Sequence, residues 1–197
     1  MWKRKRARCI AAGSMAGVAV MGMLTCTATS AHAADLGFGI KSLWRPYKVL
    51  DVANFSTGDR GRVHLWEWRN FSPETYVWNQ RWSRELMGHS ASGNPVYRFI
   101  NAHSGKCLDK SEDSPNGNGN LVYQFECNYH FNQLWEAIPS GDYGYWQLKN
   151  FAGGRCLDIE GPREDNGTTI HVWDCYSIDG KPAPNQVWNI TATVPGR

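Results

Sequence analysis

Asn132-Gln133-Leu134-Trp135 decides the fold, because the same pattern occurs 53 residues before it and again 53 residues after it. The other two copies are Asn79-Gln80-Arg81-Trp82 and Asn185-Gln186-Val187-Trp188. A single Gln-x-Trp triplet is weak evidence, whereas three in the same phase indicate a threefold internal repeat.

Two further blocks precede each of these stretches in the same order. The first ends in Leu-Asp, and the second is a six-residue alternation of apolar and polar side chains that is typical of a strand with one buried face. The Leu-Asp blocks are Val49-Leu50-Asp51, Cys107-Leu108-Asp109 and Cys156-Leu157-Asp158. The alternating blocks are residues 63–68, 122–127 and 170–175.

Turn-rich segments such as residues 56–61, 115–119 and 161–167 separate these blocks and indicate short strands joined by turns. Three units of about 50 residues, each with about four strands, cannot bury their apolar faces alone and must share one core. We therefore predict an all-β fold, a β-trefoil closed from twelve strands. Its repeats are expected at about residues 42–90, 91–140 and 141–193.

The formal charge of +3 comes from the N-terminal segment. Residues 1–33 contain five basic side chains and no acidic one, so 16 basic and 18 acidic residues remain, a net charge of −2. Nucleic-acid binding loses its electrostatic basis, because no basic excess is left to neutralise phosphates. The high content of Trp, Tyr, Phe and Gly also excludes a coiled coil or a disordered chain.

Residues 1–33 predict a secretory signal peptide that is cleaved after Ala33. Basic residues extend to Arg8, an apolar stretch covers residues 10–24, and Ala-His-Ala closes the segment. An uncleaved membrane anchor would need about 20 predominantly apolar residues, and glycines interrupt this stretch. A lipoprotein is disfavoured, because small residues do not precede Cys26. We expect a secreted protein whose single domain spans residues 34–197, without membrane insertion.

Four cysteines follow this segment: Cys107, Cys127, Cys156 and Cys175. An even number in an exported chain favours disulfides. Three pairings are possible, and the separations of 20 and 19 residues favour Cys107–Cys127 and Cys156–Cys175, the same bridge made twice. Zinc is disfavoured, because there is no C-x-x-C pair and no close Cys/His spacing. We expect no metal and no other cofactor.

The three Gln-x-Trp triplets, the Leu-Asp pairs and the cysteine-flanked alternation make residues 42–190 resemble the ricin B-chain-type lectins, also called carbohydrate-binding module family 13. In that family each unit can form a shallow sugar pocket. The pocket has an Asp, an aromatic platform, a polar side chain two residues before the platform and an Asn after it. The resemblance implies Asp51, His64, Trp66 and Asn79 in the first unit, Asp109, Tyr123, Phe125 and Asn132 in the second, and Asp158, His171, Trp173 and Asn185 in the third.

Sugar chemistry agrees with these residue types. The apolar C–H face of a sugar ring packs on a flat aromatic side chain, and Asp and Asn pair with its hydroxyl groups. We expect the third unit to bind best, because it keeps its bridge and its pocket residues together. The first unit has Val49 and Trp68 in place of cysteines, and Phe125 is a smaller platform. The Gln-x-Trp tryptophans are expected in the shared core.

The sequence thus predicts a secreted, non-enzymatic lectin with up to three pockets for glycans or a polysaccharide. Three alternatives remain: the cell-targeting subunit of a multicomponent toxin with a partner chain, a trefoil that binds a protein such as a protease, and an enzyme. The sequence shows no separate carboxylate pair for glycoside cleavage. Gly88-His89-Ser90-Ala91-Ser92 matches a nucleophile elbow only in part.

Overall fold

The computed structural model of this chain describes residues 37–69, 77–112, 117–161 and 163–191. The predicted signal peptide, residues 1–33, lies outside these ranges. The described residues form β-strands and short 3-10 helices and contain no α-helix, so the all-β prediction is confirmed. No helix among them is long and apolar enough to cross a membrane.

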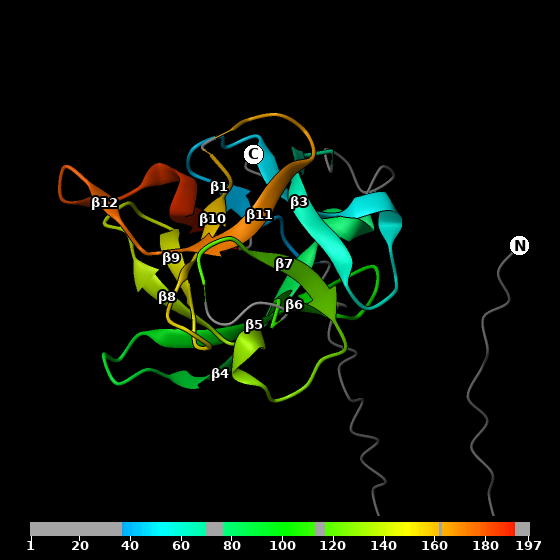
Figure 1. Ribbon diagram of the computed structural model, residues 1–197, viewed down its shortest axis with the longest axis horizontal. Helices are drawn as coiled ribbons and strands as arrows, with labels where there is room; N and C mark the ends of the chain where they lie inside the picture. The colour runs from blue at the N-terminus through cyan, green and yellow to red at the C-terminus, as the bar shows by residue number, and fades with distance from the viewer. Residues whose placement is uncertain (1–36, 70–76, 113–116, 162, 192–197) are drawn as a thin grey trace, which may run out of the picture. The chain divides into compact units, whose positions relative to one another are not determined.

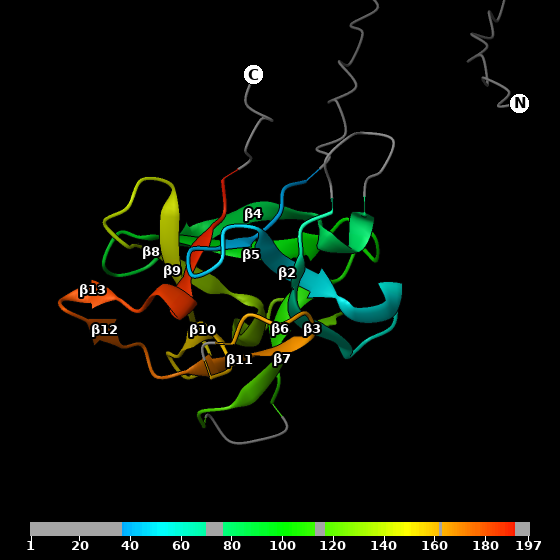
Figure 2. The same cartoon turned by 90° about the horizontal axis from the view of Figure 1, so that it is seen from above.

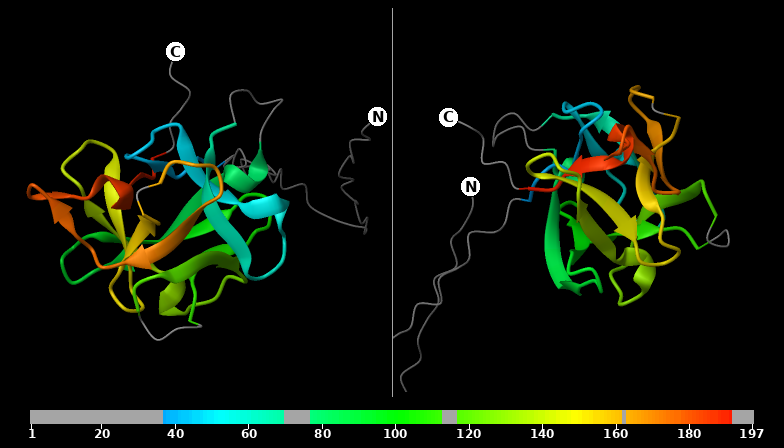
Figure 3. Two further views of the ribbon diagram at one scale, coloured as in Figure 1. Left: turned by 45° about the horizontal axis from the view of Figure 1, so that its top comes forward. Right: turned by 90° about the vertical axis from the view of Figure 1, so that its left-hand side faces the viewer.

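Twelve strands join in one sheet. Their bounds are β1 (Lys41–Ser42), β2 (Lys48–Val52), β3 (Gly61–Glu67), β4 (Trp82–His89), β5 (Pro95–Asn101), β6 (Cys107–Lys110), β7 (Asn120–Phe125), β8 (Trp135–Pro139), β9 (Tyr145–Asn150), β10 (Cys156–Ile159), β11 (Thr168–Trp173) and β14 (Val187–Asn189). A separate hairpin is formed by β12 (Ser177–Ile178) and β13 (Lys181–Pro182). Figure 2 and the left panel of Figure 3 show this hairpin projecting from the other strands.

Three strands, β3, β7 and β11, pair with one another, and Figure 1 shows them side by side. Gly61 of β3 pairs with Gln124 of β7, and Thr168 of β11 pairs with Leu65 of β3. His171 of β11 pairs with Leu121 of β7. Because each of the three strands contacts both others, the sheet closes on itself as in a β-trefoil.

The core lies under this closure and is built from the Leu-Asp and Gln-x-Trp segments. Trp82, Trp135 and Trp188 are fully buried, and each indole Nε1 donates to the backbone oxygen of the leucine in a Leu-Asp pair. The three leucines, Leu50, Leu108 and Leu157, are themselves buried in the same hydrophobic cluster. These tryptophans therefore stabilise the fold by packing and leave no surface for a ligand.

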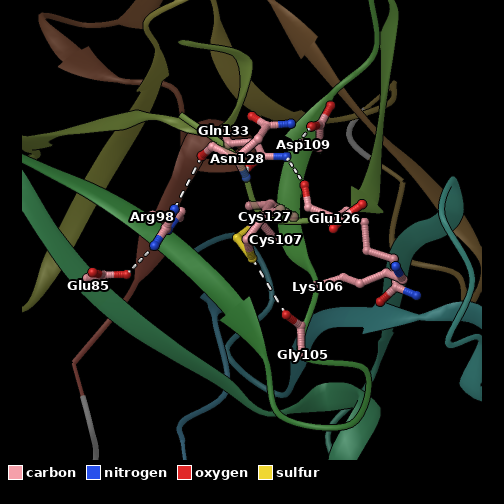
Figure 4. The surroundings of a disulfide bond; sticks show 12 residues. Glu85, Arg98, Gly105, Lys106, Cys107, Asp109, Glu126, Cys127, Asn128 and Gln133 are labelled. Atoms are coloured by element: carbon pink, nitrogen blue, oxygen red, sulfur yellow. Dashed lines mark hydrogen bonds and ion pairs between the residues drawn. A yellow bond between two sulfur atoms is a disulfide. The ribbon is translucent and has the colours of Figure 1, made fainter. Parts of the chain in front are cut away.

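The two predicted disulfides are present, Cys107–Cys127 and Cys156–Cys175. Each joins the start of one strand to the segment just after its hairpin partner: β6 to the end of β7, and β10 to the end of β11. Figure 4 shows Cys107–Cys127 beside Asp109 and Gln133. In the first hairpin, where cysteines are missing, the Trp68 ring packs so close to Gly39 that a Cβ there would lie 2.6 Å from it.

Four short 3-10 helices complete the described part of the chain: η1 (Ala53–Phe55), η3 (Trp78–Gln80), η4 (Phe131–Gln133) and η5 (Pro184–Gln186). The last three carry the Asn-Gln pairs, and in each helix the Asn and the Gln are buried. The 3-10 turn thus aims two adjacent amide side chains at the neighbouring β-hairpin, where the predicted pocket aspartates lie.

Candidate functional site

Each predicted pocket is built on a β-hairpin in which the Asp faces a polar residue of the next strand. Asp158 of β10 is directly opposite His171 of β11. Side chains two residues apart on a strand lie on the same face, so Trp173 shares a face with His171 and lies beside Asp158. In the other two hairpins the corresponding pairs are Asp51–His64 and Asp109–Tyr123.

In the third hairpin the Asp158 carboxylate is held by two side chains. His171 donates from Nε2 to Oδ1 over 2.9 Å, and Asn185 of η5 donates from Nδ2 to Oδ2 over 2.9 Å. The hydroxyl of Tyr176 donates in turn to Oδ1 of Asn185 over 2.8 Å. Asp158, His171 and Asn185 are all buried, so this hydrogen-bonded set has one fixed arrangement.

Trp173 is the exposed part of this site. Its side chain is 42% exposed, and its ring stacks on the His171 ring with centroids 5.4 Å apart. Both rings, Asp158, Asn185 and Tyr176 line a pocket of about 550 Å³. An apolar ring face next to an ordered carboxylate and amide is the combination that a sugar ring requires.

The first hairpin repeats much of this arrangement. His64 donates from Nε2 to Oδ1 of Asp51 over 3.0 Å, and Asn79 donates from Nδ2 to the same oxygen over 3.0 Å. The His64 ring stacks on Trp66 with centroids 5.0 Å apart. These residues line a smaller pocket, of about 220 Å³.

Two features distinguish this first pocket. Arg69 lines it, with Nη2 lying 3.8 Å from Oδ2 of Asp51. Asn54 and Phe55 of η1 form another part of the wall, and both have positive φ, 56° and 51°. A positive φ is strained for a bulky residue such as Phe, and such strain is often found at functional sites.

The second hairpin brings its predicted residues together differently. Asn132 donates from Nδ2 to Oδ1 of Asp109 over 2.8 Å, and Gln133 donates from Nε2 to Oδ2 over 2.7 Å. Tyr123 is buried with the Arg60 guanidinium over its ring, and it does not take the place of the histidines on the carboxylate. Phe125, two residues later, is partly exposed.

Burial raises the pKa of the Asp109 carboxyl from its usual 3.8 to about 6. The hydrogen bonds from Gln133 and Asn132 lower this pKa, but the effect of burial is larger. Both donors are neutral amides, so they do not offset the cost of burying the charge as a cation would. As with Asp158 in the third hairpin, both oxygens of the Asp109 carboxylate already accept from protein side chains.

The three glutamines hold the segment after each platform. Gln186 donates from Nε2 to the backbone oxygen of Asp174 over 2.9 Å and accepts from the backbone N–H of Tyr176. Gln80 and Gln133 make the same pair of bonds in their hairpins, and Figure 4 shows Gln133 between Asp109 and Glu126. The glutamines position the pockets, and only Gln133 also bonds a pocket carboxylate.

Sequence reasoning missed several residues that line the pockets. Tyr176 and Arg69 both lie three residues after a platform, where the third hairpin has Tyr and the first has Arg. Glu160 also lines the third pocket. The signal available in the sequence was that Tyr176 and Arg69 have the same spacing from their platforms. It was missed because the residue type at this position changes from unit to unit. The described residues contain no cluster of His, Cys, Asp and Glu that could hold a metal ion.

The described residues define an all-β protein with a β-trefoil-like fold. Residues 78–173 match the family model described as a ricin-type beta-trefoil lectin domain-like family. The predicted resemblance of the chain to ricin-type β-trefoil lectins is therefore confirmed. No curated protein matches the chain significantly.

Solved structures share this fold. A designed 3-fold symmetric protein, ThreeFoil, is 29% identical, with a TM-score of 0.64 over 77% of this chain and 95% of that chain. The C-terminal half of an earthworm R-type lectin, solved with GalNAc, is 17% identical, with a TM-score of 0.53 over 77% of this chain and 94% of that one. A chain of the Haemophilus ducreyi cytolethal distending toxin is 18% identical, with a TM-score of 0.54 over 77% and 80%.

Proposed function

We propose that this protein is a secreted, non-catalytic lectin that binds glycans through pockets of its three Gln-x-Trp units. The observation that carries the proposal is the third pocket, where the fixed carboxylate of Asp158 lies beside the exposed ring of Trp173. The ricin-type lectin family match supports carbohydrate binding in general.

The three units are proposed to differ in strength. The third pocket has a volume of about 550 Å³, whereas the first has the same His–Trp stack in a pocket of about 220 Å³. The second is proposed to bind weakest, because its platform is the smaller ring of Phe125 and because Asp109 lacks the histidine donor that Asp51 and Asp158 have. Several weak pockets on one chain would raise apparent affinity for a polysaccharide by on the order of 10²-fold through effective concentration.

Secretion is part of the proposal. It is supported by the charged, apolar and Ala-His-Ala pattern of residues 1–33 and by two disulfides, which persist in oxidising compartments. A mass measurement of protein recovered from culture medium should give a chain that begins at Ala34.

A glycan array followed by calorimetry with the strongest glycan tests the lectin function. Trp173→Ala removes the ring platform, and Asp158→Asn replaces the acceptor that fixes His171 and Asn185. Each should weaken binding by about tenfold or more. Tyr143→Ala is the control. It removes an exposed aromatic side chain that lines neither the first nor the third pocket, and it should change affinity by less than about twofold.

The outcomes separate the alternatives. Unchanged binding in both pocket variants would show that the third pocket is wrongly assigned. If no glycan binds while the unfolding transition shows an intact fold, the lectin function itself must be abandoned.

A second candidate is the cell-targeting subunit of a multicomponent toxin. The similarity to a chain of a cytolethal distending toxin, over 80% of that chain, supports it at the level of the fold. It predicts a second polypeptide that co-purifies with this one from the source cells at a fixed ratio. A chain that is recovered alone, and that binds glycans without a partner, would favour the first candidate.

A further inference from the structure

One position is equivalent in the three hairpins although its residue type differs. It is the third residue after each platform, and its backbone N–H donates to the Oε1 atom of the unit's glutamine. The three residues and distances are Arg69 to Gln80 at 3.0 Å, Asn128 to Gln133 at 2.9 Å and Tyr176 to Gln186 at 3.2 Å. The glutamine thus fixes the backbone at this point whichever side chain it carries.

The side chain at this position lies over the pocket in the first and third hairpins. In the third, the Tyr176 hydroxyl donates to Asn185 and its ring lines the pocket. In the first, the Arg69 guanidinium lies 5.9 Å from the centroid of the Trp66 ring and 3.8 Å from the Asp51 carboxylate. Arg69 is 44% exposed, so part of its N–H fork still faces solvent.

The charge of the two pockets differs as a result. Asp158 and Glu160 line the third pocket, and no lysine or arginine is among its described lining residues. The first pocket has one carboxylate, Asp51, and one guanidinium, Arg69. An acidic ligand would therefore meet two carboxylates in the third pocket, whereas in the first it would meet a cation placed beside the ring platform.

We propose that Arg69 makes the first pocket select a carboxylate-bearing pyranose, such as a uronic acid residue of a polysaccharide. This inference rests on the proposed lectin function. The sugar ring packs against Trp66, and its carboxylate accepts from the free edge of the guanidinium. Arginine suits this role because its planar fork pairs with a carboxylate through two parallel hydrogen bonds.

The neighbouring hydrogen bonds support this assignment. His64 and Asn79 both donate to Oδ1 of Asp51, whereas Oδ2 is buried without a hydrogen-bond partner among the described residues. Arg69 is therefore attracted to Asp51 by charge without being locked into a short hydrogen bond. It can turn toward an acidic ligand, because its guanidinium is 44% exposed and the hydrogen bonds of His64 and Asn79 to Oδ1 of Asp51 do not depend on it.

Galacturonate and galactose oligomers of equal length and linkage are the probes, because their sugars differ only at C6, which is a carboxylate group in galacturonate and a hydroxymethyl group in galactose. Calorimetry is performed on the Trp173→Ala protein, so that the third pocket contributes little. We expect galacturonate to bind at least about threefold more tightly than galactose at low salt, and the preference to shrink as salt screens the pair. Adding Arg69→Gln should lower galacturonate affinity by about three- to tenfold and leave galactose affinity within about twofold.

Lys181→Gln in the same background is the matched control. It removes one positive charge at an exposed residue of β13, outside the pocket linings described above, and should leave the acid preference intact. A galacturonate preference that survives Arg69→Gln would overturn the inference. So would a gain in galactose affinity, because Arg69 would then be blocking the platform.

A galactose-6-sulfate oligomer that binds as tightly as the uronate would also overturn it, by showing a general anion site. If the unaltered protein binds neither neutral nor acidic glycans, the proposed lectin function fails. If it binds neutral glycans through Trp173 but shows no effect of Arg69, only the inference fails.

Discussion

Replacing Asp109 by asparagine is expected to stabilise the protein at neutral pH. Asp109 is almost fully buried, and its described hydrogen bonds come from the neutral amides of Asn132 and Gln133. Burial raises the pKa of its carboxyl to about 6. The folded state therefore holds this proton more tightly than the unfolded state does, and stability is lost as pH rises from about 4 through about 6.

The magnitude follows from that pKa. A rise of roughly two units from 3.8 corresponds to about 3 kcal/mol of cost for the charged form. Asp109→Asn removes this cost but replaces one acceptor by a donor, which costs about 1 kcal/mol. Oδ1 of Asn132 is buried without a partner among the described residues, so a rotated Asn132 amide can accept from the new donor. The net gain at pH 7 is then about 2 kcal/mol.

Urea unfolding of both proteins between about pH 4 and pH 7 measures the effect. Between these pH values the stability difference should change in the variant's favour by up to about 3 kcal/mol, ending at a net gain of about 2 kcal/mol at pH 7. The other titrating groups are shared by both proteins and cancel. Asp51→Asn is the comparison, and it should lose stability, because His64 and Arg69 lose their carboxylate partner. A stability difference between Asp109→Asn and the parent that does not change with pH would refute the reasoning.

Two further predictions concern the stability of the fold. Cys156→Ser combined with Cys175→Ser opens a loop of 19 residues and should lower the free energy of unfolding by about 3 kcal/mol in denaturant titration; a loss under about 1 kcal/mol would show that the bridge constrains little. Trp188→Phe removes the indole N–H that donates to Leu157 and leaves a small cavity, so it should cost about 2–4 kcal/mol by the same measurement. Binding of glycans by the folded fraction should be unchanged in Trp188→Phe, because this side chain is fully buried.

The residues of the shared core were predictable from the sequence, because the same physical role requires the same residue type in every unit. A buried indole that packs in the core and donates to a leucine carbonyl has few substitutes, so Trp82, Trp135 and Trp188 recur at fixed spacing. The disulfide pairing was predictable for a related reason. A bridge across one hairpin repeats with nearly the same separation, 20 and 19 residues.

The details of the pockets were not predictable in the same way. Asp and Asn occupy equivalent positions in all three units. The glutamines Gln80, Gln133 and Gln186 are also equivalent in the sequence, so the sequence does not show that Gln133 donates to Oδ2 of Asp109. The second hairpin has Tyr123 where the other two have a histidine that donates to the carboxylate. Gln133 supplies the second donor to Asp109 in its place. That outcome depends on side-chain packing, which repeat spacing does not encode.

The glutamines explain why the pockets can diverge while the fold remains constant. Each binds backbone groups of the first and third residues after its platform, so these bonds do not depend on the side chain of the third residue. In the second and third units a disulfide also holds this segment. The side chains of Arg69 and Tyr176 are consequently not needed to hold this backbone, whereas Asn128 also accepts from the backbone N–H of His130 through Oδ1. A substitution of Arg69 or Tyr176 should therefore change which ligand binds and leave the unfolding midpoint nearly unchanged, whereas a change of the glutamine itself should alter both.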